Sequence, residues 1–230
     1  MNKSENSRRT FITRFIAGSA ALGFTSLINP LKAAENRGAI TINSPLDSKD
    51  KNNADAWLEK INGKHKIMFD VLKADSIFLN FSHTFLESNN EMGVSDAEQS
   101  VVVIMRHIGI ILALNDAVWS KYKLGETFDV KDEATKAPAS RNMYWDPKKS
   151  DSLASDRSIQ SLQKRGVMFA VCESAIDSLS GRLARLRDLE KLEVKKDFFD
   201  GVLPSIQVVP SGVWAIGRVQ ERGCGYCVGA

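Results

Sequence analysis

The sequence predicts an α/β fold, a three-layer α/β/α sandwich around a mainly parallel sheet of about five strands. The first indication is a set of short, fully apolar runs such as residues 101–105 (VVVIM), whose lack of a polar face is typical of strands buried on both sides. The second is that longer segments with helical spacing separate these runs. Strands that alternate with helices along the chain favour a parallel sheet covered on both faces.

Strands and helices are expected in alternating order. The strands are expected at residues 66–71, 101–105, 166–171, 206–209 and, at an edge of the sheet, 225–228. The helices are expected over residues 76–88, 108–122, 158–165 and 176–186, and from Gly212 toward Gly223, a typical glycine of a helix C-terminus.

Residues 123–155 break this alternation. They include Pro138, Pro147, many charged residues and the adjacent aromatic residues Tyr144 and Trp145. Loops of this length are often functional. We expect the segment to lie on the surface, with Tyr144 or Trp145 folded over the strand ends as a ligand lid, since aromatic side chains bury large apolar areas.

The N-terminus has the features of a twin-arginine export signal. Arg8 and Arg9 precede an aromatic and an aliphatic residue, and a short apolar run follows at residues 15–28. This run is too short and too broken by Gly and Ser to be a convincing membrane span. We expect a signal peptide at 1–34, a polar linker at 35–56 and an α/β domain at 57–230, delivered to the periplasm by the twin-arginine translocase.

Most of the positive charge of the chain belongs to this predicted signal. The whole chain carries a formal net charge of +3 and residues 1–34 carry +4, so the remainder carries −1. Proteins that bind nucleic acid or anionic membranes usually carry a marked excess of basic residues. The remaining chain therefore predicts no nucleic-acid partner.

Cys172 and His107 are the candidate catalytic residues. Cys172 lies where the strand at 166–171 ends and a helix begins, and ligands of open α/β sheets bind outside the carboxyl ends of the strands. A helix N-terminus favours the thiolate, whereas a buried core cysteine is the alternative interpretation. His107 follows the strand at 101–105, so we expect it at the same edge, where it could assist the thiol; a histidine that caps the next helix is the alternative.

Cys224 and Cys227 form a C-x-x-C motif, which is typical of thiol–disulfide oxidoreductases. Such motifs gain a reactive thiol by starting a helix, but an edge strand is expected here. Side chains three residues apart on a strand point to opposite faces. A structural role is therefore favoured over a redox pair, which stays as an alternative. The three cysteines and three histidines also lack the clustered spacing of a zinc site, and no metal is expected.

Several stretches resemble the DsrE-like family (DsrE, DsrF and DsrH) of sulfur-relay proteins, in an exported branch that carries a twin-arginine signal. The resembling stretches are KHKIMFDV (64–71), VVVIMRH (101–107), GVMFAVCES (166–174) and LPSIQVVPSGVWAIGRVQERGCGY (203–226). The last is the most specific, although Pro204-Ser205 stands where the family usually has Pro-Gly. The long segment at 123–155 and the C-x-x-C motif depart from the compact members of the family.

The resemblance implies a three-layer domain that is often oligomeric, in which a cysteine accepts sulfur as a persulfide and passes it to a partner. Cys172 matches one cysteine position of that family. The leading hypothesis is a periplasmic protein that handles sulfur or thiols through Cys172, with a sulfur-donor or sulfur-acceptor protein as its partner. The alternatives are a non-enzymatic module that binds a small ligand, and a thiol–disulfide oxidoreductase that uses Cys224 and Cys227.

Replacing both Arg8 and Arg9 by Lys should leave the protein in the cytoplasm, because the export receptor recognises the arginine pair. Fractionation of cells that express the double variant measures this directly. Normal accumulation of the variant in the periplasm would contradict the twin-arginine interpretation.

Overall fold

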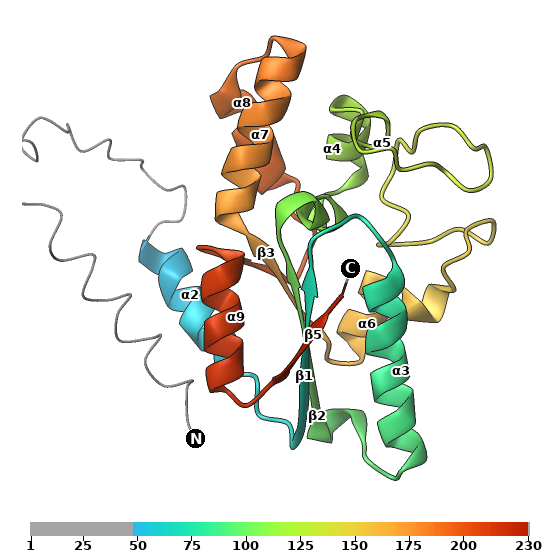
Figure 1. Ribbon diagram of the computed structural model, residues 1–230, viewed down its shortest axis with the longest axis vertical. Coiled ribbons are helices and arrows are strands. Elements are labelled where there is room, and N and C mark those ends of the chain that lie inside the picture. The colour runs from blue at the N-terminus through green and yellow to red at the C-terminus, as the bar shows by residue number, and fades with distance from the viewer. Residues whose placement is uncertain (1–47, 230) are drawn as a thin grey trace, which may run out of the picture. The chain divides into compact units, whose positions relative to one another are not determined.

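Five parallel strands form one sheet in the order β4-β3-β2-β1-β5 (Figure 1). This computed structural model describes residues 48–229, so the predicted export signal lies outside the described residues. The strands are β1 His65–Val71, β2 Gln99–Met105, β3 Met168–Cys172, β4 Ile206–Val209 and β5 Gly225–Val228. All five strands occur where the sequence predicts them, and the last is an edge strand beside β1.

The apolar, β-branched runs explain why these segments form the centre of the sheet. All seven residues of β2 are buried, and the last four residues of β1 are buried as well. The register between β1 and β2 runs from His65 opposite Gln99 to Val71 opposite Met105. Both strands therefore end at the same level, and the residues that follow them meet at one edge of the sheet.

Helices cover both faces of the sheet, which makes three layers (Figure 1). Phe69 and Val103 point to the face that packs against α3, α6 and α7, whereas Met68 and Val102 point to the face that packs against α2 and α9. The helices are α2 Ser48–Leu58, α3 Ile77–Glu91, α4 Asp116–Lys121, α5 Leu124–Thr127, α6 Ile159–Lys164, α7 Glu173–Arg187, α8 Lys191–Asp200 and α9 Gly212–Glu221. Short 3-10 helices occur at η1 Asp96–Glu98, η2 His107–Ala113 and η3 Ser155–Arg157. The three-layer α/β/α sandwich that the sequence predicts is confirmed.

The strand order explains why the helices divide between the two faces. From β1 to β4 each new strand is added on the same side, with α3, α6 and α7 in the connections. The chain then returns from β4 to the far edge through α9, and β5 pairs with β1. Crossover connections between parallel strands are right-handed. A connection that moves along the sheet in the opposite direction must therefore pass over the opposite face. The connections after β3 and β4 therefore leave toward opposite faces.

The prediction of a single helix over residues 108–122 is wrong. The chain forms η2, which ends before Leu114, and then α4, which begins after Asn115. Two contacts separate these elements: Leu114 forms an antiparallel bridge with Val202, and the Asn115 side chain accepts a hydrogen bond from the backbone N–H of Val118. An asparagine in this position starts a helix and cannot continue the preceding one.

The polar linker predicted over residues 35–56 also needs correction. α2 begins at Ser48, inside that range, and Ala54 is buried in the core between α2, α9 and the sheet. Trp57 and Leu58 complete its apolar contact with that core. The sequence of α2 is mostly polar, so its apolar pattern alone does not indicate a helix. Packing against the sheet stabilises it. α8, which the sequence analysis did not assign, pairs with α7 beyond the edge of the sheet.

Residues 123–155 fold back onto the domain around Asn142. Its buried side-chain amide donates to the carbonyl oxygens of Leu112 and Leu114, both at 2.8 Å, and its side-chain oxygen accepts from the backbone N–H of Tyr144. This one side chain therefore supplies hydrogen bonds to the two backbone carbonyl groups at the end of η2. It also fixes the long segment against the core.

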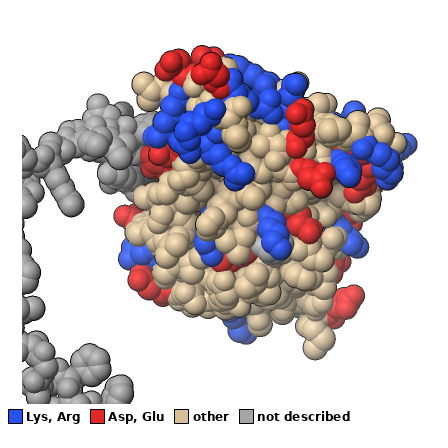
Figure 2. Space-filling model, turned by 45° about the horizontal axis from the view of Figure 1, so that its top comes forward, with Lys and Arg blue, Asp and Glu red and all other residues tan. Residues whose placement is uncertain are grey.

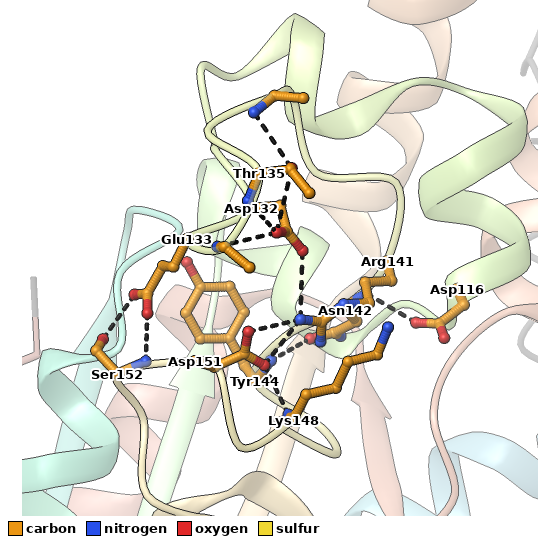
Figure 3. A network of polar contacts seen from close by, with 12 residues as sticks. Asp116, Asp132, Glu133, Thr135, Arg141, Asn142, Tyr144, Lys148, Asp151 and Ser152 are labelled. Carbon is orange, nitrogen blue, oxygen red and sulfur yellow. Dashed lines mark hydrogen bonds and ion pairs between the residues drawn. The ribbon is translucent and has the colours of Figure 1, made fainter.

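A second set of contacts closes the outer part of this segment (Figure 3). Nη2 of Arg141 donates to both carboxylate oxygens of Asp151, at 2.6 and 2.8 Å, and to Asp132 at 3.3 Å. Glu133 accepts hydrogen bonds from the backbone N–H and the hydroxyl of Ser152. The segment is thus an ordered loop built on polar contacts. Among the described residues, no helix has the length and apolar character needed to cross a membrane.

Changing Asn142 to Asp should lower the free energy of unfolding by about 3 kcal/mol, because a buried carboxylate would face two carbonyl oxygens where the amide now donates. Asn62→Asp is the matched control, since it makes the same change at an exposed position. Urea denaturation of the two variants compares them. Equal stability of the two would contradict the role given to Asn142.

Candidate functional site

Cys172 ends β3 and acts as the N-cap of α7. Its Sγ accepts a hydrogen bond from the backbone N–H of Ala175 at a distance of 3.3 Å. The residue is 5% exposed. The first backbone N–H groups of a helix have no partner within the helix and carry a partial positive charge. The sulfur therefore lies where negative charge on it is stabilised.

A buried carboxylate holds Arg106 just beyond β2. Nε of Arg106 donates to Oδ1 of Asp70 at 2.7 Å, and Nη2 donates to Oδ2 at 2.8 Å. Asp70 lies in β1 and is fully buried. The hydroxyl of Tyr226, from β5, donates to the same Oδ2 at 2.8 Å. Three neighbouring segments of the sheet thereby fix one guanidinium group at the carboxyl edge.

The start of α9 packs closely against Arg106. A β-carbon at Gly212 would lie 2.7 Å from Cδ and 2.8 Å from Cβ of Arg106, which is closer than real contacts allow. Only a glycine therefore lets the first turn of α9 approach that side chain. Ser211 caps α9 by accepting from the N–H of Trp214, and the hydroxyl of Ser174 donates to the carbonyl of Pro210 at 2.9 Å. The starts of α7 and α9 are thus joined.

A pocket of about 350 Å³ lies among these elements. Its walls come from the segment after β2, the first turns of α7 and the start of α9, and they include Arg106, Cys172, Arg182 and Gly212. β3 and β4, whose connections leave toward opposite faces, end beside it. Ligands of open α/β sheets usually bind at such a reversal, outside the carboxyl ends of the strands. The pocket is therefore the candidate functional site.

The charge of the pocket lining is one-sided. Arg106 and Arg182 line it, and within the described part of the chain no Asp or Glu does. Figure 2 shows Lys and Arg gathered in the upper part of one face of the molecule, with Asp and Glu beside them. The pocket itself is consequently suited to a group with negative charge.

His107 lines the same pocket as Cys172, so the structure brings the two predicted catalytic residues together. His107 is exposed, and its backbone φ of 51° lies in the left-handed region. Such a backbone conformation is uncommon for a residue other than glycine and marks a sharp turn out of β2. The same turn lets the backbone N–H of Arg106 donate to the carbonyl of Val71 at 2.9 Å.

The structure does not bring Cys224 and Cys227 together. Both are free thiols. Cys224 is buried in the core beneath α2 and α9, whereas Cys227 packs against the core on the opposite face of the sheet. Burial raises the pKa of Cys224 to about 11, and the nearby charge of Lys66 opposes this only in part. Neither sulfur lines the pocket at Cys172.

The two aromatic residues expected as ligand lids also lie away from this pocket. Tyr144 is buried, packs on Trp119 with ring centroids 6.5 Å apart, and donates through its hydroxyl to the carbonyl of Ala74 at 3.3 Å. Burial raises the pKa of Tyr144 to about 12. Trp145 is partly buried against the same core. Neither residue lines the pocket, so both secure the long segment instead.

Sequence patterns did not indicate four residues of the site: Asp70, Arg106, Tyr226 and Arg182. A local signal existed for the first two, because a charged residue near the end of an apolar strand needs a partner when it is buried. No local signal connects Tyr226 with them, since it lies 156 residues beyond Asp70. Among residues 48–229, no group of three or more His, Cys, Asp or Glu side chains could hold a metal ion.

The fold and the pocket define a class: an α/β protein with a candidate ligand site at the carboxyl edge of a parallel sheet. The chain matches no protein-family model and no curated protein. It is similar to a solved protein of unknown function from Methanobacterium thermoautotrophicum, at 18% identity and a TM-score of 0.34, over 71% of this chain and 98% of that one. A similarity this weak carries no functional conclusion.

The raised pKa of Cys224 has a measurable consequence. In a Cys172→Ser/Cys227→Ser variant, alkylation of Cys224 should increase up to about pH 11. At pH 8 its thiolate should be about a hundredfold scarcer than for a thiol with the reference pKa of 9.0, since each unit of pKa is a factor of ten. The same variant unfolded in urea is the control. A midpoint near pH 9 in the folded protein would contradict the burial described here.

Proposed function

We propose that this protein is a DsrE-like sulfur-handling protein in which Cys172 accepts a sulfur atom at the pocket and holds it as a persulfide for a partner. One observation carries the proposal: the Cys172 sulfur lies in the wall of a pocket and accepts a hydrogen bond at the N-terminus of α7. Cys172 also packs in the core on the face of the sheet that α7 covers, so the pocket is the feature that distinguishes it from a purely structural cysteine. The periplasmic location belongs to the same proposal and depends on the N-terminal residues, which lie outside the described part of the chain.

Two positively charged features lie near the Cys172 sulfur. α7 is 15 residues long, so its N-terminus carries the full partial charge of a helix end. The hydrogen bond to Asp70 is the main cause that raises the pKa of Arg106, and Cys172 is the last of the neighbouring groups that contribute to it. Burial acts in the opposite direction, since it disfavours any charged sulfur. Cys172 is only 5% exposed, and the pocket that it lines is the route by which a substrate would reach its sulfur.

The proposed reaction is a transfer of one sulfur atom without net oxidation. The Cys172 thiolate attacks the outer sulfur of a persulfide donor, R–S–SH, and forms a new S–S bond. The S–S bond of the donor breaks, and its electron pair leaves with the donor as the thiolate R–S⁻. The proton stays on the transferred sulfur, which leaves Cys172 as Cys–S–SH. Attack by a thiolate of an acceptor on that outer sulfur reverses the sequence and passes the atom on.

A module that binds a small anion without chemistry is the second candidate, because the pocket is lined by two arginines and, within the described residues, by no carboxylate. It differs from the proposal in leaving Cys172 unmodified. A thiol–disulfide oxidoreductase built on Cys224 and Cys227 has less support, since their sulfurs lie on opposite faces of the sheet.

The test is persulfide formation in a Cys224→Ser/Cys227→Ser variant, which keeps Cys172 as the sole cysteine. After incubation with glutathione persulfide, intact mass spectrometry should show the gain of one sulfur atom on the folded protein. Its removal by a small thiol should restore the original mass. The triple variant that adds Cys172→Ser is the matched control and should gain nothing. A folded protein whose Cys172 takes up no sulfur until it is denatured would exclude the proposed function.

A further inference from the structure

We infer that the pocket takes a small sulfur compound that also carries an anionic group, such as a carboxylate or a sulfonate, and that Arg106 binds this anion. The inference rests on the proposed function and adds to it the class of substrate. Both residues line one cavity, so a ligand could meet the Cys172 sulfur with one end and the guanidinium with the other.

Arg106 keeps part of its guanidinium free for a ligand. Its Nε and Nη2 atoms donate to Asp70, whereas Nη1 has no hydrogen-bond partner among residues 48–229. The side chain is 20% exposed, and Arg106 is one of the residues that line the pocket. A planar guanidinium with a free N–H edge matches the oxygen atoms of a carboxylate or sulfonate.

The surroundings hold that free edge in place before any ligand arrives. Asp70, which accepts a hydrogen bond from Tyr226, fixes one side of the guanidinium, and Gly212 lets α9 pack along the Arg106 stem. A side chain that is already positioned loses little conformational entropy when it binds. Asp70 and Tyr226 therefore act as positioning residues for Arg106 and do not face the ligand themselves.

Other groups supply the net positive charge, because Arg106 and Asp70 neutralise each other. Arg182, an exposed residue of α7, lines the pocket and has no ion-pair partner in the described part of the chain. The N-termini of α7 and α9 add their partial positive charges at the same cavity. These contributions all have one sign, and within the described residues no acidic side chain of the lining opposes them.

The volume of the pocket limits the ligand to a small molecule. About 350 Å³ lies at the lower end of the range of roughly 300–1,000 Å³ that small-molecule sites occupy. A persulfide with a short chain and one acidic group fits this volume. A folded partner protein could offer such a group only on an extended segment.

Three thiol-reactive reagents that share the ethyl methanethiosulfonate group and carry different charges test the inference. They are the 2-sulfonatoethyl, 2-hydroxyethyl and 2-(trimethylammonio)ethyl methanethiosulfonates, which are anionic, neutral and cationic. In each reaction the Cys172 thiolate attacks the sulfur that bears the ethyl group, the S–S bond breaks, and methanesulfinate leaves. Rates are measured with Cys172 as the sole cysteine and divided by the rate of each reagent with free 2-mercaptoethanol, so that intrinsic reactivity cancels.

The normalised rate of the anionic reagent should exceed that of the neutral one by about tenfold, the factor expected for one good charge-assisted hydrogen bond. Arg106→Gln should remove most of this ratio. Arg185→Gln should retain it, since Arg185 lies on α7 with an exposed side chain that does not line the pocket. Because Arg106→Gln leaves Asp70 buried without a partner, the Asp70→Asn/Arg106→Gln variant is measured as well, and it should lose the ratio while keeping the fold.

The two proposals fail in different ways. If Cys172 reacts with all three reagents at equal normalised rates, the anion inference is overturned while the thiol keeps its role. If the ratio survives in both Arg106 variants, Arg106 is not the anion-binding residue. If none of the reagents labels Cys172 in the folded protein, the proposed function itself falls.

Discussion

The buried ion pair between Asp70 and Arg106 is the interaction on which the carboxyl edge of the sheet depends. A carboxylate that is fully buried costs several kcal/mol unless it is paired and hydrogen-bonded. Arg106 supplies two hydrogen bonds of 2.7 and 2.8 Å, and Tyr226 supplies a third. The pair therefore joins β1, the segment after β2 and the terminal strand β5. Through Arg106 it also sets the position of one wall of the pocket.

Topology brings the other groups of the site to the same place. Because the chain adds strands in one direction and then returns through α9, the connections after β3 and β4 leave toward opposite faces. The starts of α7 and α9 consequently flank one pocket. Cys172 lies at the start of α7, so it reaches this pocket. Gly212 lies at the start of α9 and allows that helix to approach Arg106. The proposed sulfur chemistry uses a cavity that the strand order creates.

Local patterns predicted the strands well, and they placed Cys172 and His107 at the correct edge. They failed where long-range contacts decide the structure. α2 is polar in sequence and is a helix because Ala54 and its neighbours pack on the sheet. The helix expected at residues 108–122 divides because Leu114 pairs with a residue far along the chain. The guanidinium that completes the site is fixed by Asp70, and Asp70 is held in turn by Tyr226, which no spacing rule connects to β1 or β2.

A crystal structure of the protein with Cys172 labelled by the 2-sulfonatoethyl reagent, and the other two cysteines changed to Ser, tests the central claim most directly. The claim is that the thiol and the fixed guanidinium act on one ligand. The account predicts that the sulfonate oxygens lie within hydrogen-bonding distance of Arg106, which stays paired with Asp70. A sulfonate that points into solvent, away from an unchanged Arg106, would contradict the account.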